Sequence, residues 1–227
     1  MGLTRYQQKR RFTETPEPKG SVKRTKRQKT FVVQRHDASH LHYDFRLEAE
    51  GVLKSWAVPK GPSLNPQDKR LAMMVEDHPV SYGTFQGVIP EGNYGAGFVD
   101  VWDHGTYEPV DEQGETITEK EFLAHLAAGS IKFRVKGRKL KGEFALVKMK
   151  GRGENTWLLI KHRDEYAQEE YNAEDYAKKS SLKKSAEKRE KRELKKSPPK
   201  KKTVANAART KKAPVKPAAK KAAVKKK

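Results

Sequence analysis

A strictly alternating segment between His40 and Leu47 constrains the fold more than any other part of the chain. Successive side chains of a β-strand point to opposite faces, so one face of this segment is apolar and the other is polar. The apolar face requires a core to pack against. The polar face spans roughly 20 Å at about 3.3 Å per residue and carries His40, His42, Asp44 and Arg46. A divalent metal together with an anionic substrate would explain why these four groups converge.

Short runs of strand-forming residues follow one another along the chain and are separated by Gly, Pro and Asn turn signals. Candidate strands cover residues 30–34, 40–47, 52–58, 70–76, 97–104, 105–109, 130–135, 142–149 and 156–161. This pattern predicts a mainly β fold, either a barrel or a sandwich. One helix is expected over 118–128, with Thr118 as N-cap, Glu121 completing a capping box and Gly129 ending the helix.

Charge is distributed unevenly along the 227 residues, whose formal net charge is +21. Residues 1–30 carry +8 and residues 178–227 carry +19, so the stretch between them is mildly acidic. We predict a basic N-terminal arm (1–30), a β domain (31–168) and a charged helical or disordered tail (169–227). The Lys/Ala/Pro-rich end of the tail is expected to be disordered. Basic segments of this kind favour polyanions, most commonly nucleic acid.

The chain contains no cysteine, which excludes disulfides, zinc thiolates and thiol catalysis. No apolar run is long enough to span a bilayer, and the N-terminus lacks the apolar region of a signal peptide. We therefore expect no membrane partner and a cytoplasmic, nucleoid-associated protein.

Two histidines and one carboxylate form a candidate metal site. His42 and Asp44 are neighbours on one face of the predicted strand, and His36 can reach them across the turn at 37–39. Mixed N/O ligation with room for water suits an octahedral ion such as Mn²⁺ or Fe²⁺ better than a closed zinc site. The alternative is a surface strand with solvated histidines.

Other polar residues are candidates for phosphate binding and proton transfer. Arg46 offers a planar fork for phosphate oxygens, although a salt bridge to Asp44 or Glu48 is the alternative. His78, two residues after Glu76, could act as a general acid or as a charged stabiliser, or be structural. Tyr82 could bind a phosphate oxygen.

Lys60 and Arg70 flank a proline-containing loop, and each is a candidate phosphate contact. The glycine-rich stretch 90–97 lacks the Lys-Ser/Thr pair of a nucleotide P-loop. A tight turn that permits close backbone approach is the better interpretation of this stretch.

Taken together, these segments resemble the 3′-phosphoesterase domain of bacterial ligase D, the multifunctional ligase of non-homologous end joining. The resemblance runs from about residue 9 to about residue 168. Several long motifs in order carry it, namely FVVQRHDASHLHYDFRLE at 31–48, LKSWAVPKGP at 53–62, VEDHP at 75–79, PEGNYGAG at 90–97 and WLLIK at 157–161.

The resemblance implies a compact β-barrel enzyme that binds Mn²⁺ and trims DNA 3′ ends. It implies removal of a terminal ribonucleotide, then of the remaining 3′-phosphate, to leave a 3′-OH. By position it makes His36, His42 and Asp44 metal ligands, and Arg46, His78 and Tyr82 catalytic or phosphate-binding residues. Substrate-binding or supporting positions are Arg10, Glu17, Gln34, Lys60, Arg70 and Glu76.

The chain departs from this family in two respects. Arg11 occupies a position, just before Phe12, where the family has an acidic residue, which concerns the ribonuclease step more than the metal site. No room remains after about residue 168 for a ligase or polymerase domain, so we expect a stand-alone version. A separate DNA ligase, polymerase and end-binding protein would then be its partners, and the basic tail would hold it on DNA.

Two other functions compete with this interpretation. One is an Fe²⁺-dependent oxygenase, because His42, Asp44 and a distal His78 imitate its facial triad. The other is a non-catalytic nucleoid or repair scaffold, in which the basic segments are the whole function.

Overall fold

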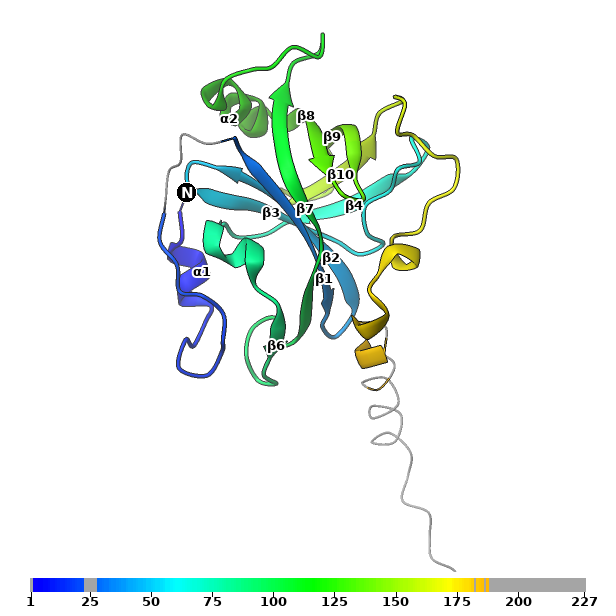
Figure 1. Cartoon of the computed structure of the whole chain (residues 1–227). Helices are drawn as coiled ribbons and strands as arrows, with labels where there is room; N and C mark the ends of the chain where they lie inside the picture. Colours follow the sequence, from blue (N-terminus) through cyan, green and yellow to red (C-terminus); the bar gives the residue numbers. More distant parts are fainter. Residues whose placement is uncertain (1, 23–27, 182, 186, 188–227) are drawn as a thin grey trace, which may run out of the picture.

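Eight antiparallel strands close into a barrel in the computed structural model, which describes residues 2–22, 28–181, 183–185 and 187. Figure 1 shows the long strands of its front wall crossing at the centre of the molecule. Pairing of the first strand with the seventh completes the ring. Around the barrel, the order is β1 (Thr30–Asp37), β2 (Leu41–Ala49), β3 (Val52–Val58), β4 (Lys69–Met74), β10 (Thr156–Lys161), β9 (Lys141–Lys148), β8 (Ser130–Gly137) and β7 (Gly97–Val110).

The sequence predicted every strand of the barrel, with one difference. Residues 97–104 and 105–109 were expected to form two strands, but they form the single 14-residue strand β7. Gly105 does not make a turn: a Cβ there would lie 2.1 Å from the carbonyl oxygen of Lys136 on β8. The glycine is required because two neighbouring backbones approach closely.

The barrel interior holds the main hydrophobic core. Phe31 and Val33 of β1 and Phe45 and Leu47 of β2 belong to it, and all four are at most 1% exposed. The apolar face of the 40–47 segment is therefore the interior face. Since alternate residues point the other way, the polar face of β1 and β2 lies on the outside of the barrel wall.

Helix α2 (Glu119–Ala128) forms where the sequence predicted it. The Thr118 side chain accepts from the Glu121 backbone, and the Glu121 side chain accepts from the Thr118 backbone. Gly129 ends the helix with φ 91°, a left-handed conformation that suits glycine.

Four short elements surround the outer face of the β1–β2–β3 wall. Strand β5 (His78–Pro79) pairs with β3, and β6 (Gly87–Ile89) pairs with β7. Figure 1 places α1 (Thr4–Gln8) beside the 3-10 helix η1 (Val80–Thr84). A second apolar cluster, formed by Tyr6, Val32, Leu53 and Tyr82, joins α1 and η1 to β1 and β3. The N-terminal segment of the predicted arm therefore packs on the domain, since Leu3 and Tyr6 are buried.

The chain after β10 continues across one end of the barrel and includes the 3-10 helix η2 (Ala173–Tyr176). Trp102 donates to the carbonyl of Ala173, and Arg35 pairs with Glu174. The sequence predicted a charged helical or disordered tail over 169–227, yet Ala173 and Ser181 are each 1% exposed. Polar side chains of this segment bind the barrel.

Part of the predicted tail lies outside the described residues, including the whole of 197–227. Among the described residues, no helix is long and apolar enough to cross a membrane.

Candidate metal centre and phosphate site

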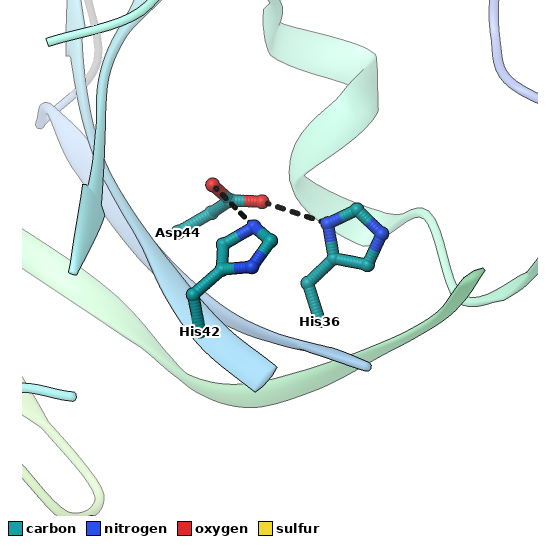
Figure 2. Close-up of side chains that lie close together, drawn as sticks. All are labelled: His36, His42 and Asp44. Carbon is teal, nitrogen blue, oxygen red and sulfur yellow. Dashed lines mark ion pairs between the residues drawn. The ribbon is translucent and has the colours of Figure 1, made fainter. Parts of the chain in front are cut away.

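His36, His42 and Asp44 converge on the outer face of the barrel wall, as Figure 2 shows. Cross-strand pairing places His36 directly opposite His42, and Asp44 follows two residues later on the same face. The possible ligand atoms of the three side chains all lie within 4.8 Å of one another. One carboxylate oxygen of Asp44 lies 3.6 Å from Nδ1 of His36, and the other lies 3.8 Å from Nε2 of His42. His40, on the same predicted face, is exposed.

The backbone fixes the orientation of both imidazoles. His36 Nε2 lies 2.9 Å from the carbonyl oxygen of Gly95, and His42 Nδ1 lies 3.0 Å from that of His40. Because a carbonyl only accepts, each of these nitrogens carries the proton. In the neutral form of each ring, the opposite nitrogen then presents a lone pair toward Asp44. Two imidazole nitrogens and a carboxylate that face one another, with both histidines held by backbone carbonyls, could hold a metal ion.

Asp44 is ionised because it lies beside the guanidinium of Arg46. Burial would raise the pKa of this carboxyl, but Arg46 holds it well below its usual range. A carboxylate and two imidazoles fit a divalent cation of the Mn²⁺ or Fe²⁺ class.

Arg46 is clamped beside the triad with a 2% exposed side chain. It donates to Asp44 at 3.0 Å, to Gln34 at 2.9 Å and to the Ser55 hydroxyl at 2.8 Å. The salt bridge to Asp44 considered from the sequence is therefore present. These bonds use three of the five N–H groups of a guanidinium, so phosphate binding remains compatible with the pair. Ser55 is a supporting residue that the sequence reasoning missed.

Gln34 connects this clamp to η1. Its amide oxygen accepts from Arg46, while its amide nitrogen donates to the carbonyls of Tyr82 and Phe85 at 3.0 and 2.9 Å. Gln34 is fully buried. Gln34 therefore links the orientation of Arg46 to the position of η1.

His78 is a neutral imidazole in this structure. Burial lowers its pKa well below 6.5, and the nearby Arg46 and Arg10 lower it further. Nδ1 lies 2.9 Å from the Glu76 carbonyl and therefore donates, whereas Nε2 accepts from Arg10 at 3.0 Å. The charged stabiliser considered for His78 is thus disfavoured, because a second proton would meet two guanidinium groups.

Arg10 brings the N-terminal segment into the site. It donates to Glu17 at 2.8 Å and to Glu76 at 3.1 Å, besides its contact with His78. Glu17 also accepts from the buried Tyr82 hydroxyl at 3.0 Å. Lys9, which the sequence did not single out, pairs with Glu76 at 3.0 Å. Arg10, Glu17, Glu76, His78 and Tyr82 thus form one network.

Three residues lie apart from this network. Arg70 pairs with Asp68 and donates to the Tyr171 carbonyl, on the β4 side of the barrel. Lys60 is exposed in the turn after β3. Their roles stay predictions. Arg11 is also exposed and pairs with Glu14 at 3.6 Å.

The glycine-rich stretch 90–97 is a turn whose last residues pack closely against the end of β1. Its Gly95 carbonyl holds His36, and a Cβ on Gly97 would lie 2.4 Å from the Asp37 carbonyl oxygen. Glycine is required because this loop approaches the end of β1.

Comparison with known proteins identifies the family. The model of the family described as the DNA Ligase D 3′-phosphoesterase domain matches residues 34–148. The chain belongs to this family. It therefore carries a phosphoesterase domain, and the family-level expectation from the sequence motifs is confirmed.

Two curated relatives extend the match beyond that range. The chain is 46% identical over 171 residues to the "Multifunctional non-homologous end joining protein LigD" of Pseudomonas aeruginosa, covering 73% of this chain and 19% of the relative. It is 42% identical over 168 residues to the "Multifunctional non-homologous end joining DNA repair protein LigD" of Mycobacterium tuberculosis, covering 74% and 20%. The chain thus spans about a fifth of the length of these relatives.

The oxygenase alternative required His78 as the third ligand. Among the described residues, the group that could hold a metal is instead His36, His42 and Asp44. Because Nε2 of His78 accepts from Arg10 and Nδ1 donates to the backbone, neither nitrogen faces that group.

Proposed function

We propose that this protein is a Mn²⁺-dependent phosphoesterase that processes DNA 3′ ends in non-homologous end joining. The observation that carries the proposal is the pairing of the three-acceptor cluster with Arg46, whose remaining N–H groups suit a phosphate. The family and the names of the two relatives support the DNA-repair context.

The proposed roles follow from the contacts. His36, His42 and Asp44 would hold the metal, which would supply Lewis-acid stabilisation of charge on a phosphoryl oxygen. Arg46 binds a second oxygen of the same phosphate. Gln34 and Ser55 keep its guanidinium fixed, so little reorganisation is needed when negative charge develops.

The N-terminal network shapes the other side of the site. Arg10, held by Glu17 and Glu76, faces His78 and provides a second cation near Arg46. The Tyr82 hydroxyl donates to Glu17, and its oxygen can still accept a hydrogen bond from a sugar hydroxyl. This arrangement would act on a 3′-terminal ribonucleotide first and on the resulting 3′-phosphate second. Exposed Arg11, which contacts Glu14, bears on the first step more than on the metal site.

A 3′-OH is the end that a DNA ligase or a polymerase requires, so such enzymes would use the product. The basic tail would raise the local concentration of the enzyme on DNA. Because Lys178 and Ser181 both bind Asp100, a deletion that tests the tail should begin at residue 188. It should weaken DNA binding at low salt and leave hydrolysis of a small phosphate ester unchanged.

The test uses Mn²⁺ and labelled primer-templates that end in one 3′-ribonucleotide or in a 3′-phosphate. His42→Ala is the inactivating variant, and His40→Ala is the matched control, because His40 is exposed and retains its carbonyl. Conversion of both ends to 3′-OH by the wild type and His40→Ala, but not by His42→Ala, supports the two-step function.

Conversion of the 3′-phosphate alone would limit the function to a phosphatase. Conversion of neither end, with DNA binding retained, would favour the non-catalytic scaffold and overturn the proposal.

A further inference from the structure

A groove of about 980 Å³ lies between α1 and the end of β4, and it contains none of the three metal-binding candidates. Its volume is at the upper end of ordinary ligand sites, which hold roughly 300–1,000 Å³. Residues on both sides of the groove contribute charge, thioether and aromatic groups, namely Arg5, Lys9, Met73, Met74, Glu76 and Tyr94.

The groove presents its cations at the surface and its carboxylates below them. Its carboxylates, Glu76 and Asp77, are buried and paired, the first with Lys9 and Arg10 and the second with Lys54 at 3.1 Å. The side chains of Arg5 and of Lys9, the partner of Glu76, are exposed. An anion entering the groove would therefore meet these two cations before the buried carboxylates.

The groove also offers an aromatic face. Tyr94 is 48% exposed, and the ammonium group of Lys9 lies 4.5 Å from its ring centre and 3.3 Å from its hydroxyl. Half-buried Met73 and Met74 add apolar, polarisable surface. Exposed aromatic rings next to cations are the elements with which proteins bind single-stranded nucleic acid, the ring stacking on a base and the cation contacting a phosphate.

A short piece of backbone connects this groove to the metal centre. Tyr94 directly precedes Gly95, whose carbonyl accepts from His36. Neighbouring Cα atoms are about 3.8 Å apart, so the ring of Tyr94 is attached next to the group that orients a metal-binding candidate. Glu76 similarly belongs to the groove and to the Arg10 network.

We infer that this groove binds the nucleotides at the 3′ end of the substrate strand, with one base stacked on Tyr94 and a phosphate contacting Arg5 and Lys9. The inference rests on the proposed function, because that function places the terminal phosphate at the metal centre. The groove would distinguish a DNA strand from a small phosphate ester, because only the strand has further nucleotides to fill it.

The test measures binding by fluorescence anisotropy, with the full chain and a 3′-phosphorylated oligonucleotide of about eight nucleotides. EDTA prevents turnover, and about 0.2 M salt weakens contacts with the basic tail. Tyr94→Ala should weaken binding about tenfold, whereas Tyr94→Phe, which retains the ring, should stay within about twofold.

Abasic substitutions at each of the last nucleotides identify the stacked base. One abasic position should weaken binding to the wild type but cause no further loss in Tyr94→Ala, because the two changes remove the same contact. Equal binding by Tyr94→Ala and wild type, or the same abasic losses in both, would overturn the inference.

A parallel assay of phosphate release with Mn²⁺ separates this inference from the proposed function. No release from any substrate, with the coupling between Tyr94 and one base intact, would remove the catalytic proposal and retain the strand-binding groove. Phosphate release that is insensitive to Tyr94→Ala at every strand length would overturn the strand-binding groove and retain the catalytic proposal.

Discussion

Arg10 donates a hydrogen bond to Nε2 of His78 across 3.0 Å, and this contact fixes the tautomer of a buried imidazole. A guanidinium cannot accept, so Nε2 carries no proton, and Nδ1 donates to the Glu76 carbonyl at 2.9 Å. A residue of the N-terminal segment thereby fixes which ring nitrogen of a histidine 68 positions later holds the proton.

This state makes stability depend on pH. Burial, together with Arg46 and Arg10, lowers the pKa of His78 well below 6.5, so the unfolded chain takes up a proton that the folded chain rejects. The contribution of neutral His78 is complete above about pH 6.5 and is lost as pH falls toward the folded pKa. His78→Gln should flatten the dependence by up to about 1.4 kcal/mol per pH unit below that value.

Urea unfolding followed between about pH 5 and pH 7.5 measures this effect. His40→Gln is the control, because His40 is exposed and should leave the slope unchanged. Identical slopes for wild type and His78→Gln would contradict the neutral assignment.

Gln34→Ala should loosen η1 and Arg46 together. The substitution removes the acceptor for Arg46 and both donors to the carbonyls of Tyr82 and Phe85. These groups are buried, and unsatisfied buried groups cost about 1–3 kcal/mol each, so we expect a total loss of about 2–4 kcal/mol. Hydrogen exchange of residues 80–86 should become faster.

Gln34→Glu separates the two contacts. It keeps an acceptor for Arg46 but places a carboxylate oxygen against two carbonyls, so exchange in 80–86 should still rise. Unchanged exchange in both variants would show that η1 is held by the apolar cluster around Tyr82 alone.

Local pattern was sufficient to predict the wall of the barrel and the shared face of His42 and Asp44, whereas metal binding by this cluster stays a prediction. A strand period of two decides the face of each side chain, so His42, Asp44 and Arg46 were placed together correctly. The short turn after Asp37 then forces cross-strand pairing of His36 with His42. The capping box of α2 was equally local.

Contacts between distant segments had no local signal. Arg35 and Glu174 are 139 positions apart, and neither lies in a pattern that indicates the other. Helix α1 has five residues, too few to establish a helical period. Arg10 and Glu17 were expected in the site from family resemblance, and their contacts with His78 and Tyr82 required the folded chain.

Asp44→Asn should remove metal binding while keeping the shape of the side chain. The amide lacks the negative charge that two imidazole lone pairs face, so the affinity for Mn²⁺ should fall by more than about 100-fold. Thermal unfolding with MnCl₂ or EDTA measures this, because a ligand of the folded state raises the midpoint. His40→Ala should respond to Mn²⁺ like the wild type. If Mn²⁺ raised the unfolding midpoint of Asp44→Asn as much as that of the wild type, the metal would bind elsewhere.

Glu174→Ala should destabilise the fold, because Glu174 joins the segment after β10 to the barrel. Arg35, whose side chain is 1% exposed, donates to both carboxylate oxygens of Glu174, at 2.7 and 2.9 Å, and Tyr43 donates to the same group.

Removing one partner of a buried pair costs about 3–5 kcal/mol, and because Glu174 itself is 30% exposed we expect about 2–3 kcal/mol. Urea unfolding measures the loss, with exposed Glu170→Ala as the matched control. Equal midpoints for Glu174→Ala and wild type would mean that the segment after β10 rests on the barrel without stabilising it. In that case the burial of Arg35 would depend on its contact with Ser185 instead.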